Sequence, residues 1–405
     1  MQRRAWALTV ILLVALLAAC SGHRFLDQPL HEIARIPAPG GGYEALRDGY
    51  LLVLAGNRHL RCYRTADGSA LWEVAVPSEG EERVWSTGFL RGIYAARVAT
   101  DAIPLVVART KWVARGADVR ATSEGAVVYV SGGQIRWKFG PLYDPYPYMS
   151  EDGRWVLINA LVDPFDEKTS VFLIDAESGQ VVWHRDLAGA ARAQPHEVSG
   201  EERVLITSRA STGGEAAVLL DLQGRELVRF TMPPPASESL SERVQLVAVL
   251  DEGGGHIRLR GRVLERVCDG GQVLWSRVLP RGFERYEGRP VPGTDLVAVS
   301  MERSGANRLG VFTLAGERMW ESPGLPHLAY WGVATGGIWW HSFRRGSNKG
   351  EICVVDLSPG SAGAGRIRRY AYTADAYSDV YVSPGGAYAA IRTMEIGQVL
   401  LLRLR

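Results

Sequence analysis

The sequence predicts an all-β fold, a β-propeller of eight four-stranded blades, with seven blades as the alternative. Three observations predict it: a glycine followed four residues later by tryptophan, the regular return of this pair, and a β-rich run before each copy. The full copies run from glycine to tryptophan at 68–72, 133–137, 179–183, 271–275 and 316–320. The copies also agree in detail, since Ser178-Gly-Gln-Val-Val-Trp183 almost repeats as Gly270-Gly-Gln-Val-Leu-Trp275.

Two weaker copies complete the series. Gly224 is followed by Val228 in the tryptophan place, and Gly365 is followed by Tyr370. After a first step of 65 residues, the markers are spaced by 46, 45, 47, 45 and 50 residues. A fixed period of about 40–50 residues with several short strands per copy is typical of propeller blades.

Each glycine follows a short β-rich run. Examples are Val171–Asp175, Ala217–Asp221, Gly310–Leu314 and Ile352–Asp356. Glycine suits the turn that follows because it adopts positive φ without a Cβ clash. The tryptophan then lies in the next strand, where a large flat side chain can cover a neighbouring sheet.

A second pattern opens each unit and raises the count to four strands. It reads as a short strand, a polar turn and a longer apolar strand, as in 148–158 and 381–391. The last unit ends with the run Gln398–Arg403 and lacks one strand. We expect the strand-like piece Leu30–Ile36 to supply it and to close the ring, which removes exposed sheet edges. The propeller is therefore predicted to span residues 31–405.

The first residues are predicted to be a signal peptide rather than part of the fold. Arg3 and Arg4 precede an apolar run that ends in Leu-Ala-Ala-Cys20. The run is short for a membrane span of about 20 residues, which is the alternative. The ending resembles a bacterial lipobox, which implies cleavage after Ala19 (signal peptide 1–19), a lipid on Cys20, and a tether over residues 20–30. By the same resemblance, Ser21 favours the outer membrane, facing the periplasm.

Composition is ordinary for a globular chain. Of the 405 residues, 46% are apolar and 22% are charged, and the formal net charge of +2 gives no basic excess to suggest nucleic acid. Besides Cys20, the cysteines are Cys62, Cys268 and Cys353, an odd number far apart in sequence. We expect buried unpaired thiols, with a disulfide as the alternative.

The repeats resemble a known family. The run Asp175–Trp183 and its relatives at 67–72 and 269–275 resemble the repeat of pyrroloquinoline-quinone-type eight-bladed propellers, and the openers resemble Tol-system and WD-type blades. The lipobox and the length are similar to those of the propeller lipoproteins of the outer-membrane β-barrel assembly machinery. That resemblance implies a binding scaffold without a cofactor. The repeat itself indicates the fold rather than the function, because one repeat serves both dehydrogenases and non-catalytic scaffolds.

No catalytic residues are predicted, and neither is a metal or a cofactor. Quinone dehydrogenases of this fold carry an adjacent cysteine pair, which this chain lacks. The acidic loop 163–168 is predicted to be a solvated turn, with calcium binding as the alternative. Phosphate loops and nucleophile elbows are missing from the sequence. The histidines show no metal-ligand spacing and stand at His23, His31, His59, His184, His196, His256, His327 and His341.

Two features are candidates for a partner-binding surface. The long first step inserts about 19 residues near 83–120, where aromatic residues alternate with arginines, the usual anchors of interfaces. The alternative is a pair of longer strands or a packed hairpin. The second feature is a set of aromatic residues before two blades, which line the axial channel or pack blade on blade. The candidates are Trp85, Phe89, Arg91, Tyr94, Trp112, Tyr143, Tyr146 and Trp331.

The sequence thus predicts a monomeric, lipid-anchored propeller of the bacterial cell envelope. Its expected role is non-enzymatic: it presents loops or a blade edge to a protein partner, with strand addition as one mode. Two alternatives stay open, an enzyme of the hydrolase or lactonase kind that uses the axial funnel, and a glycan-binding module.

Overall fold

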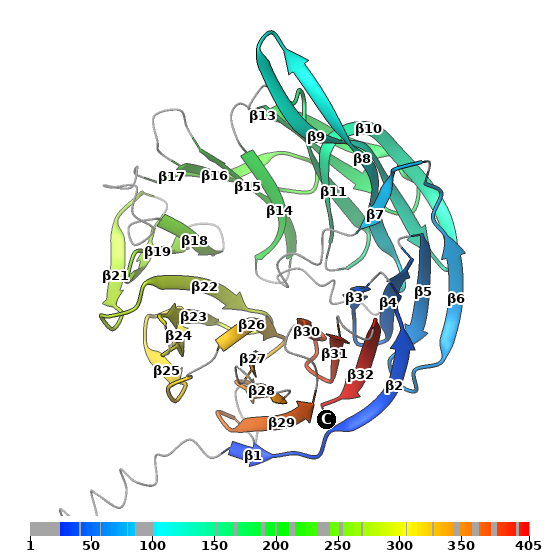
Figure 1. Cartoon of the computed structure of the whole chain (residues 1–405). Helices are drawn as coiled ribbons and strands as arrows, with labels where there is room; N and C mark the ends of the chain where they lie inside the picture. Colours follow the sequence, from blue (N-terminus) through cyan, green and yellow to red (C-terminus); the bar gives the residue numbers. More distant parts are fainter. Residues whose placement is uncertain are drawn as a thin grey trace, which may run out of the picture.

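The computed structural model is a ring of antiparallel sheets around a central axis (Figure 1). The described residues contain strands, turns and bends, with no helix among them. No segment in this part of the chain therefore qualifies as a membrane-spanning helix. The structure describes residues 25–404 except 40–41, 57, 79, 86–99, 151, 166–167, 188–190, 199–200, 210–214, 233–243, 251–253, 269, 305, 326–327, 344–348, 359–363, 374–378 and 394–396.

The strands follow one another around the ring in blades that we number in chain order. Blade 1 holds β3 (Gly42–Leu46), β4 (Tyr50–Ala55), β5 (His59–Arg64) and β6 (Ala70–Ala75); blade 2 holds β7 (Arg83–Trp85), β8 (Ile103–Arg115), β9 (Asp118–Ser131) and the first half of β10 (Gln134–Met149). Blade 3 holds the second half of β10, β11 (Trp155–Leu161), β12 (Thr169–Asp175) and β13 (Val181–Leu187); blade 4 holds β14 (Ala191–Val198), β15 (Glu201–Arg209), β16 (Glu215–Leu220) and β17 (Glu226–Met232).

The second half of the ring is built in the same way. Blade 5 holds β18 (Val244–Val249), β19 (His256–Arg260), β20 (Val263–Val267) and β21 (Val273–Val278); blade 6 holds β22 (Arg285–Val291), β23 (Leu296–Glu302), β24 (Arg308–Thr313) and β25 (Arg318–Glu321). Blade 7 holds β26 (Leu328–Ala334), β27 (Gly337–Phe343), β28 (Lys349–Asp356) and β29 (Ile367–Thr373) with β1 (Phe25–Asp27) beside it; blade 8 holds β30 (Asp379–Val382), β31 (Tyr388–Thr393), β32 (Gln398–Arg403) and β2 (His31–Pro37).

The blade count depends on β10, which runs without a break from one blade into the next. Hydrogen bonding groups the described strands into seven sheets, one of which has seven strands. Within it, the first part of β10 pairs with β9 and the last part pairs with β11, and the register shifts near Tyr143 on both sides. Dividing that sheet within β10 gives the eight units numbered above, of which blade 7 also carries β1 as a fifth strand.

The ring is closed by an N-terminal strand, as predicted. β2 pairs antiparallel with β32, from His31 opposite Arg403 to Pro37 opposite Gln398. The junction with blade 1 is fixed by Asp48, whose carboxylate accepts hydrogen bonds from the Ser383 hydroxyl (2.6 Å) and the Gly385 backbone N–H (2.9 Å). Closure therefore joins residues more than 330 positions apart in sequence.

The Gly-Trp repeat acts between blades rather than within one. The indole of Trp183 in blade 3 lies over Gly224 in the turn of blade 4, and its Nε1 donates to the Leu222 carbonyl at 3.1 Å. Gly224 has φ +79°, and a Cβ built there would lie 3.1 Å from the indole. Glycine is thus required twice, by the turn and by the close approach. The same contact joins Trp72 to Gly133, Trp137 to Gly179, Trp275 to Gly316 and Trp320 to Gly365.

The hydrophobic core is divided into clusters that lie between adjacent sheets. One cluster joins Leu60 and Cys62 of blade 1 to Leu105 of blade 2, all with no exposed surface. Cys62, Cys268 and Cys353 are unpaired; Cys62 and Cys353 are buried, as expected, whereas Cys268 is only half-buried. Burial raises the pKa of the Cys62 thiol to about 12 and shifts that of Cys353 in the same direction, so both are inert at neutral pH.

One strand lies where the sequence indicates only a tether. β1 (Phe25–Asp27) pairs in parallel with the outer strand of blade 7, Phe25 opposite Ile367 and Asp27 opposite Arg369. It makes blade 7 a five-stranded sheet. The predicted tether over 20–30 therefore has a docked segment at its centre.

Candidate partner-binding surface

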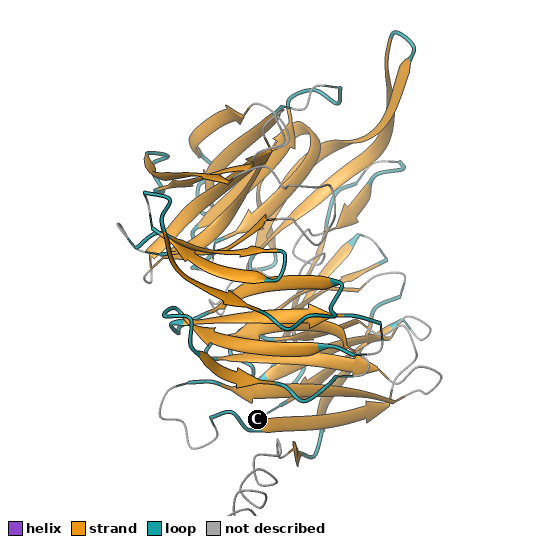
Figure 2. Cartoon of the chain, turned by 90° about the vertical axis from the view of Figure 1, so that its left-hand side faces the viewer, coloured by secondary structure: helices purple, strands orange, loops and turns teal. Residues whose placement is uncertain are grey.

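The region of the insertion predicted in blade 2 includes a long β-hairpin, formed by β8 and β9, that rises from the ring (Figures 1 and 2); residues 86–99 of this region lie outside the described part. β8 and β9 pair without interruption from Ile103 opposite Val130 to Arg115 opposite Asp118. The inner part is buried in the blade, whereas residues 109–121 are mostly exposed. Gly116, at φ +63°, makes the two-residue turn possible. The longer strands considered from the sequence are therefore present, and their outer half projects from the sheet.

The two faces of the hairpin differ in chemistry. Residues directly opposite each other in antiparallel strands share a face. One face carries the pairs Trp112–Ala121 and Ala114–Val119, and we call these four residues the apolar face. The other carries the pairs Lys111–Thr122, Val113–Arg120 and Arg115–Asp118, and we call it the polar face.

The polar face is braced against blade 3. Phe165, in the loop between β11 and β12, lies under two guanidinium groups, those of Arg115 at 5.0 Å and Arg120 at 5.6 Å from the ring centre. Arg115 also pairs with the Asp163 carboxylate at 3.0 Å. Arg120 donates to the Pro164 carbonyl at 3.3 Å. The loop 163–165, expected to be a solvated turn, thus holds the hairpin in place.

A second brace lies at the base of the hairpin. Asp144, at φ +43° in β10, accepts hydrogen bonds from the Thr122 hydroxyl (3.0 Å) and the Ser123 backbone N–H (2.6 Å). Nearby, Lys111 pairs with Glu124 at 2.9 Å. The hydrogen bond from Lys111 lowers the pKa of the Glu124 carboxyl and keeps it ionised. These contacts fix the orientation of the hairpin relative to the ring.

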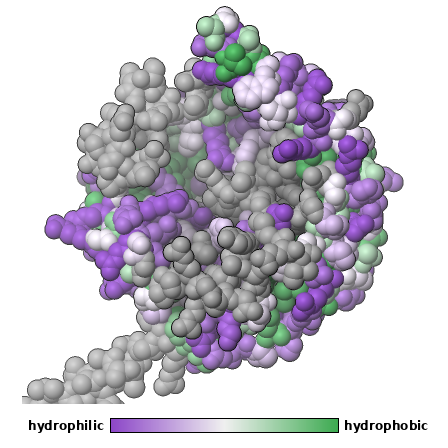
Figure 3. Space-filling model, in the orientation of Figure 1, coloured by the Kyte–Doolittle hydropathy of each residue, from purple (hydrophilic) through white to green (hydrophobic). Residues whose placement is uncertain are grey.

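The apolar face is left uncovered by the described residues. Trp112 is 72% exposed and Val119 is 60% exposed, and Ala114 and Ala121 are exposed as well. Figure 3 shows a hydrophobic area at the tip of the hairpin, surrounded by hydrophilic residues. A large exposed aromatic residue on a braced strand matches the anchors that dominate protein interfaces. The hairpin therefore presents a rigid apolar surface with a polar rim.

Several predicted site residues fall outside the part of the chain that the structure describes. Trp85 ends β7, and its side chain is not described; Phe89, Arg91, Tyr94 and Cys20 lie outside the described residues.

The aromatic residues near the axis are covered by arginines of the neighbouring blade. Arg192 of blade 4 lies over Tyr146 of blade 3 at 4.8 Å, and its Nε donates to the Tyr148 hydroxyl at 2.6 Å. Arg289 of blade 6 lies 4.5 Å over Trp331 of blade 7, which is 6% exposed. Tyr143 is partly buried in β10. These contacts match blade-on-blade packing, one of the two roles expected from the sequence, and no sequence pattern marks the two arginines.

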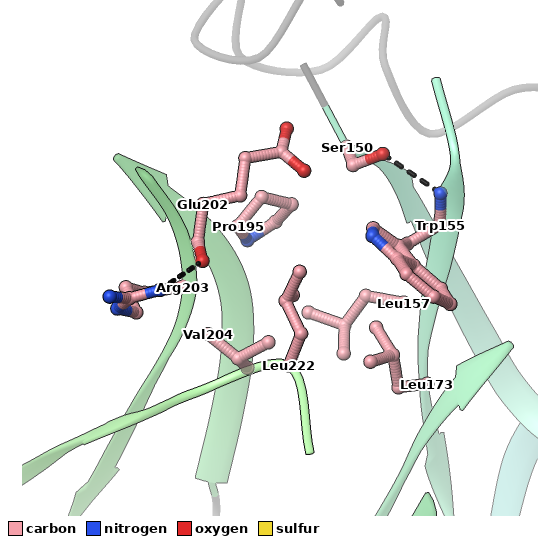
Figure 4. A pocket seen from close by; sticks show the side chains of 9 residues that line it. All are labelled: Ser150, Trp155, Leu157, Leu173, Pro195, Glu202, Arg203, Val204 and Leu222. Atoms are coloured by element: carbon pink, nitrogen blue, oxygen red, sulfur yellow. Dashed lines mark hydrogen bonds between the residues drawn. The ribbon is translucent and has the colours of Figure 1, made fainter. Parts of the chain in front are cut away.

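A small pocket lies between blades 3 and 4 (Figure 4). Two of its polar side chains accept backbone hydrogen bonds: the Ser150 hydroxyl accepts from the Trp155 N–H at 2.9 Å, and Glu202 accepts from the Asp152 N–H at 3.0 Å. The lining is mostly apolar and comes from Ser150, Trp155, Leu157, Leu173, Pro195, Glu202, Arg203, Val204 and Leu222. The pocket is therefore a gap between two blades rather than a gathering of reactive groups.

Within the described residues, no group of three or more His, Cys, Asp or Glu side chains is placed to hold a metal ion. A serine, a histidine and an aspartate come together on the outer strands of blade 3. There His184 Nε2 lies 2.9 Å from Asp186, whose carboxylate also accepts from the Ser170 hydroxyl at 2.5 Å. Because both contacts meet on one carboxylate oxygen, the histidine is not positioned between serine and aspartate as a general base requires.

This chain is similar to proteins of known structure. The WD40 domain of Sif2 superposes with a TM-score of 0.54 at 13% identity, covering 93% of this chain and 99% of that one. The crystal structure of BamB from Moraxella catarrhalis matches with a TM-score of 0.48 at 14% identity, covering 92% and 99%. No sequence among the curated proteins gives a significant match.

A family profile matches the chain directly. The profile described as outer membrane protein assembly factor BamB, of the quinone-type repeat class, matches residues 115–361. The matched part is more than half of the chain and runs from the tip of the hairpin into blade 7. It contains four of the five full Gly-Trp copies, so the match and the inter-blade contacts rest on the same repeats. This chain belongs to the family of outer membrane protein assembly factor BamB.

Proposed function

We propose that this protein is a lipid-anchored, non-enzymatic scaffold of the bacterial cell envelope that binds a protein partner through the apolar face of its hairpin. The observation that carries the proposal is Trp112, which is 72% exposed on a hairpin braced from behind. Bracing lowers the conformational entropy that a flexible loop would lose on binding. The family supports a role in envelope assembly, because its description names an outer membrane assembly factor.

Charge defines the kind of partner that fits. Residues 109–124 contain four cations (Arg109, Lys111, Arg115 and Arg120) and two anions (Asp118 and Glu124). All of these charged side chains stand on the polar face, where Lys111 pairs with Glu124 and Arg115 pairs with Asp163. The apolar face itself carries no charge, and such a surface is complementary to an uncharged apolar groove on the partner.

Anchoring through Cys20 is the second part of the proposal. The sequence from Arg3 to Cys20 supports cleavage after Ala19 and lipid attachment to Cys20. We expect mass spectrometry of the mature protein to find a diacylglyceryl group on Cys20. A Cys20→Ser variant should accumulate as an unprocessed precursor. Cleavage of that variant to a lipid-free mature protein would contradict this part.

Site-specific photocrosslinking in intact cells tests the partner surface. A photoreactive amino acid is placed at Ala121, beside Trp112 on the apolar face, or at Met319 on β25 of blade 6. Met319 is 61% exposed and serves as an equally accessible reference. We expect a discrete crosslinked product from position 121 and none of the same mass from position 319.

Substitution supplies the matched control. Trp112→Ala should remove the position-121 product, because loss of an anchor of this kind costs about 2 kcal/mol or more of binding free energy. Met319→Ala should leave the product unchanged. Both variants should melt within a few degrees of the parent, because both side chains are exposed. The same products from both positions, or persistence of the product in the Trp112 variant, would mean that the partner binds elsewhere.

A further inference from the structure

The first described segment is clamped to the outside of the ring. β1 adds a parallel strand to β29, and the pairing continues through the Gln28 N–H, which donates to the Arg369 carbonyl at 2.9 Å. Arg369 also reaches back to β1: its Nε donates to the Asp27 carboxylate at 2.6 Å, and its guanidinium lies 5.2 Å from the Phe25 ring. Backbone, charge and aromatic contacts therefore fix the same three residues.

This clamp shortens the free tether. Cys20 precedes Phe25 by five residues. A fully extended chain spans at most about 3.6 Å per residue, so Phe25 lies within about 18 Å of the Cys20 backbone. Without the clamp, the free chain would extend to β2, which begins at His31, eleven residues after Cys20. Its reach would then be about 40 Å. The short tether leaves the ring little freedom to turn about its anchor.

The clamped edge also has the chemistry of a membrane-facing surface. Phe25 and Leu26 are each 37% exposed. Arg366 is exposed on the same outer edge, and Arg368 is partly exposed beside Leu26. Apolar side chains next to arginines suit the boundary between acyl chains and anionic phosphate groups.

We propose that the outer edge of blade 7, formed by β1 and β29, faces the lipid bilayer and orients the ring edge-on to the membrane. This inference rests on the lipid anchor of the proposed function and names the surface that the anchor selects. The hairpin lies at the opposite end of the molecule from β1 in both views (Figures 1 and 2). With blade 7 at the membrane, the tip of the hairpin lies away from it, where a protein partner is accessible.

Quenching by brominated lipids tests the orientation. The mature lipidated protein, with Cys268→Ser to remove the half-buried thiol, is reconstituted in vesicles of phosphatidylethanolamine and phosphatidylglycerol with brominated chains. A fluorophore is attached either at His31→Cys, next to the clamp, or at Asp118→Cys, in the hairpin turn. We expect severalfold stronger quenching at position 31. Equal quenching at both positions, or stronger quenching at 118, would overturn the proposal.

Two variants separate the clamp from the anchor. The double substitution Phe25→Ala with Asp27→Ala should open the clamp. The difference in quenching between labels at positions 31 and 118 should then become smaller. Glu32→Ala, which removes only the neighbouring Arg35–Glu32 pair on β2, should preserve it. An unchanged difference in the double variant would show that β1 does not set the orientation. Failure of the anchor itself appears differently, as protein that does not remain on the vesicles.

Docking of β1 can also be tested without lipid. Leu26 lies opposite Arg368 in the parallel pair. Leu26→Cys with Arg368→Cys, in the Cys268→Ser chain, should form a disulfide on mild oxidation, whereas Leu26→Cys with Arg318→Cys, on blade 6, should not. Similar yields from both pairs would mean that the segment is not held on β29, and the proposed orientation would lose its basis.

Discussion

The turns at Gly179 and Gly271 have almost the same local sequence but different surroundings. Both glycines have positive φ, +71° and +81°. At Gly179 an added Cβ would lie 2.7 Å from the Trp137 ring, whereas at Gly271 no described atom lies within 4 Å. The difference comes from the preceding blade, which supplies Trp137 in one case and Val228 in the other. The repeat therefore encodes the turn locally, and the contact between blades requires two successive copies.

The seam between blades 4 and 5 is held together by other residues. Val228 in β17 pairs with Leu219 beside a register shift, as Trp183 in β13 pairs with Leu173, so the two positions are structurally equivalent. In this seam the ring of Phe230 lies 4.4 Å from that of His256. A hydrogen bond also crosses it, from the Val249 backbone N–H to the imidazole Nε2 of His196 at 3.2 Å. Aliphatic, phenyl and imidazole groups thus replace the indole.

The largest effect is expected from removing an indole. Trp183→Ala should lower the free energy of unfolding by about 3 kcal/mol, because it loses packing over Gly224 and leaves the Leu222 carbonyl without its donor. Val228→Ala, at the equivalent place, should cost about 1 kcal/mol. Chemical denaturation followed by tryptophan fluorescence and circular dichroism measures both. Equal losses would mean that the indole is not the dominant contact of its seam.

The paired glycines give the next largest effect. Alanine at positive φ costs about 1 kcal/mol at either site. Gly179→Ala should cost about 2 kcal/mol more than Gly271→Ala, because its Cβ also displaces the Trp137 ring. Thermal melts of the two variants test this difference. In a Trp137→Ala background, Gly179→Ala should destabilise the protein no more than Gly271→Ala does. If Gly179→Ala still costs more, backbone strain rather than the indole explains the difference.

The imidazole in the seam predicts a pH dependence. Burial lowers the pKa of His196 to about 4, and its Nε2 needs a free lone pair to accept the Val249 N–H. In the unfolded chain the pKa is about 6.5, so the unfolded state binds a proton first as the pH falls. The stability is therefore complete above pH 6.5 and decreases down to about pH 4, by up to about 1.4 kcal/mol per pH unit for one histidine.

His196→Gln tests this assignment because glutamine can still accept the hydrogen bond but does not titrate. Its stability should decrease less steeply between pH 6.5 and 4. Part of the dependence of stability on pH should remain in this variant, since burial also lowers the pKa of His341 in blade 7 to about 4. An unchanged slope in the His196 variant would place the titrating group elsewhere.

Much of the fold could be predicted because it is encoded locally and repeated. The Gly-Trp copies, the openers and the N-terminal strand each appear in short sequence windows, and the predicted closing strand Leu30–Ile36 is β2. The docking of β1 was missed because three residues carry no periodic signal, and their partner is more than 340 positions away.

The candidate site was only partly predictable, because its contacts also join residues that lie far apart in sequence. The sequence placed Trp112 in an insertion, but it could not show which hairpin face is braced, since Phe165 lies in another blade. Nor could it show that Tyr146 lies beneath Arg192 and Trp331 beneath Arg289. Each arginine comes from the neighbouring blade, some 40 residues away in sequence. Contacts across a seam depend on the ring geometry, which no local pattern contains.

The substitution with the smallest expected effect would make the seam between blades 4 and 5 resemble the other seams. Val228→Trp places an indole where the preceding strand already has the matching register and where Gly271 has open space in front of it. We expect a gain of about 0.5–1 kcal/mol in the free energy of unfolding, since the new packing is offset by displacement of part of the Val228 environment. Gly271→Ala should then become more damaging in the variant than in the parent, because its Cβ would meet the new ring. Additive effects of the two substitutions would show that the indole does not reach Gly271, and that the seam between blades 4 and 5 differs in shape as well as in sequence.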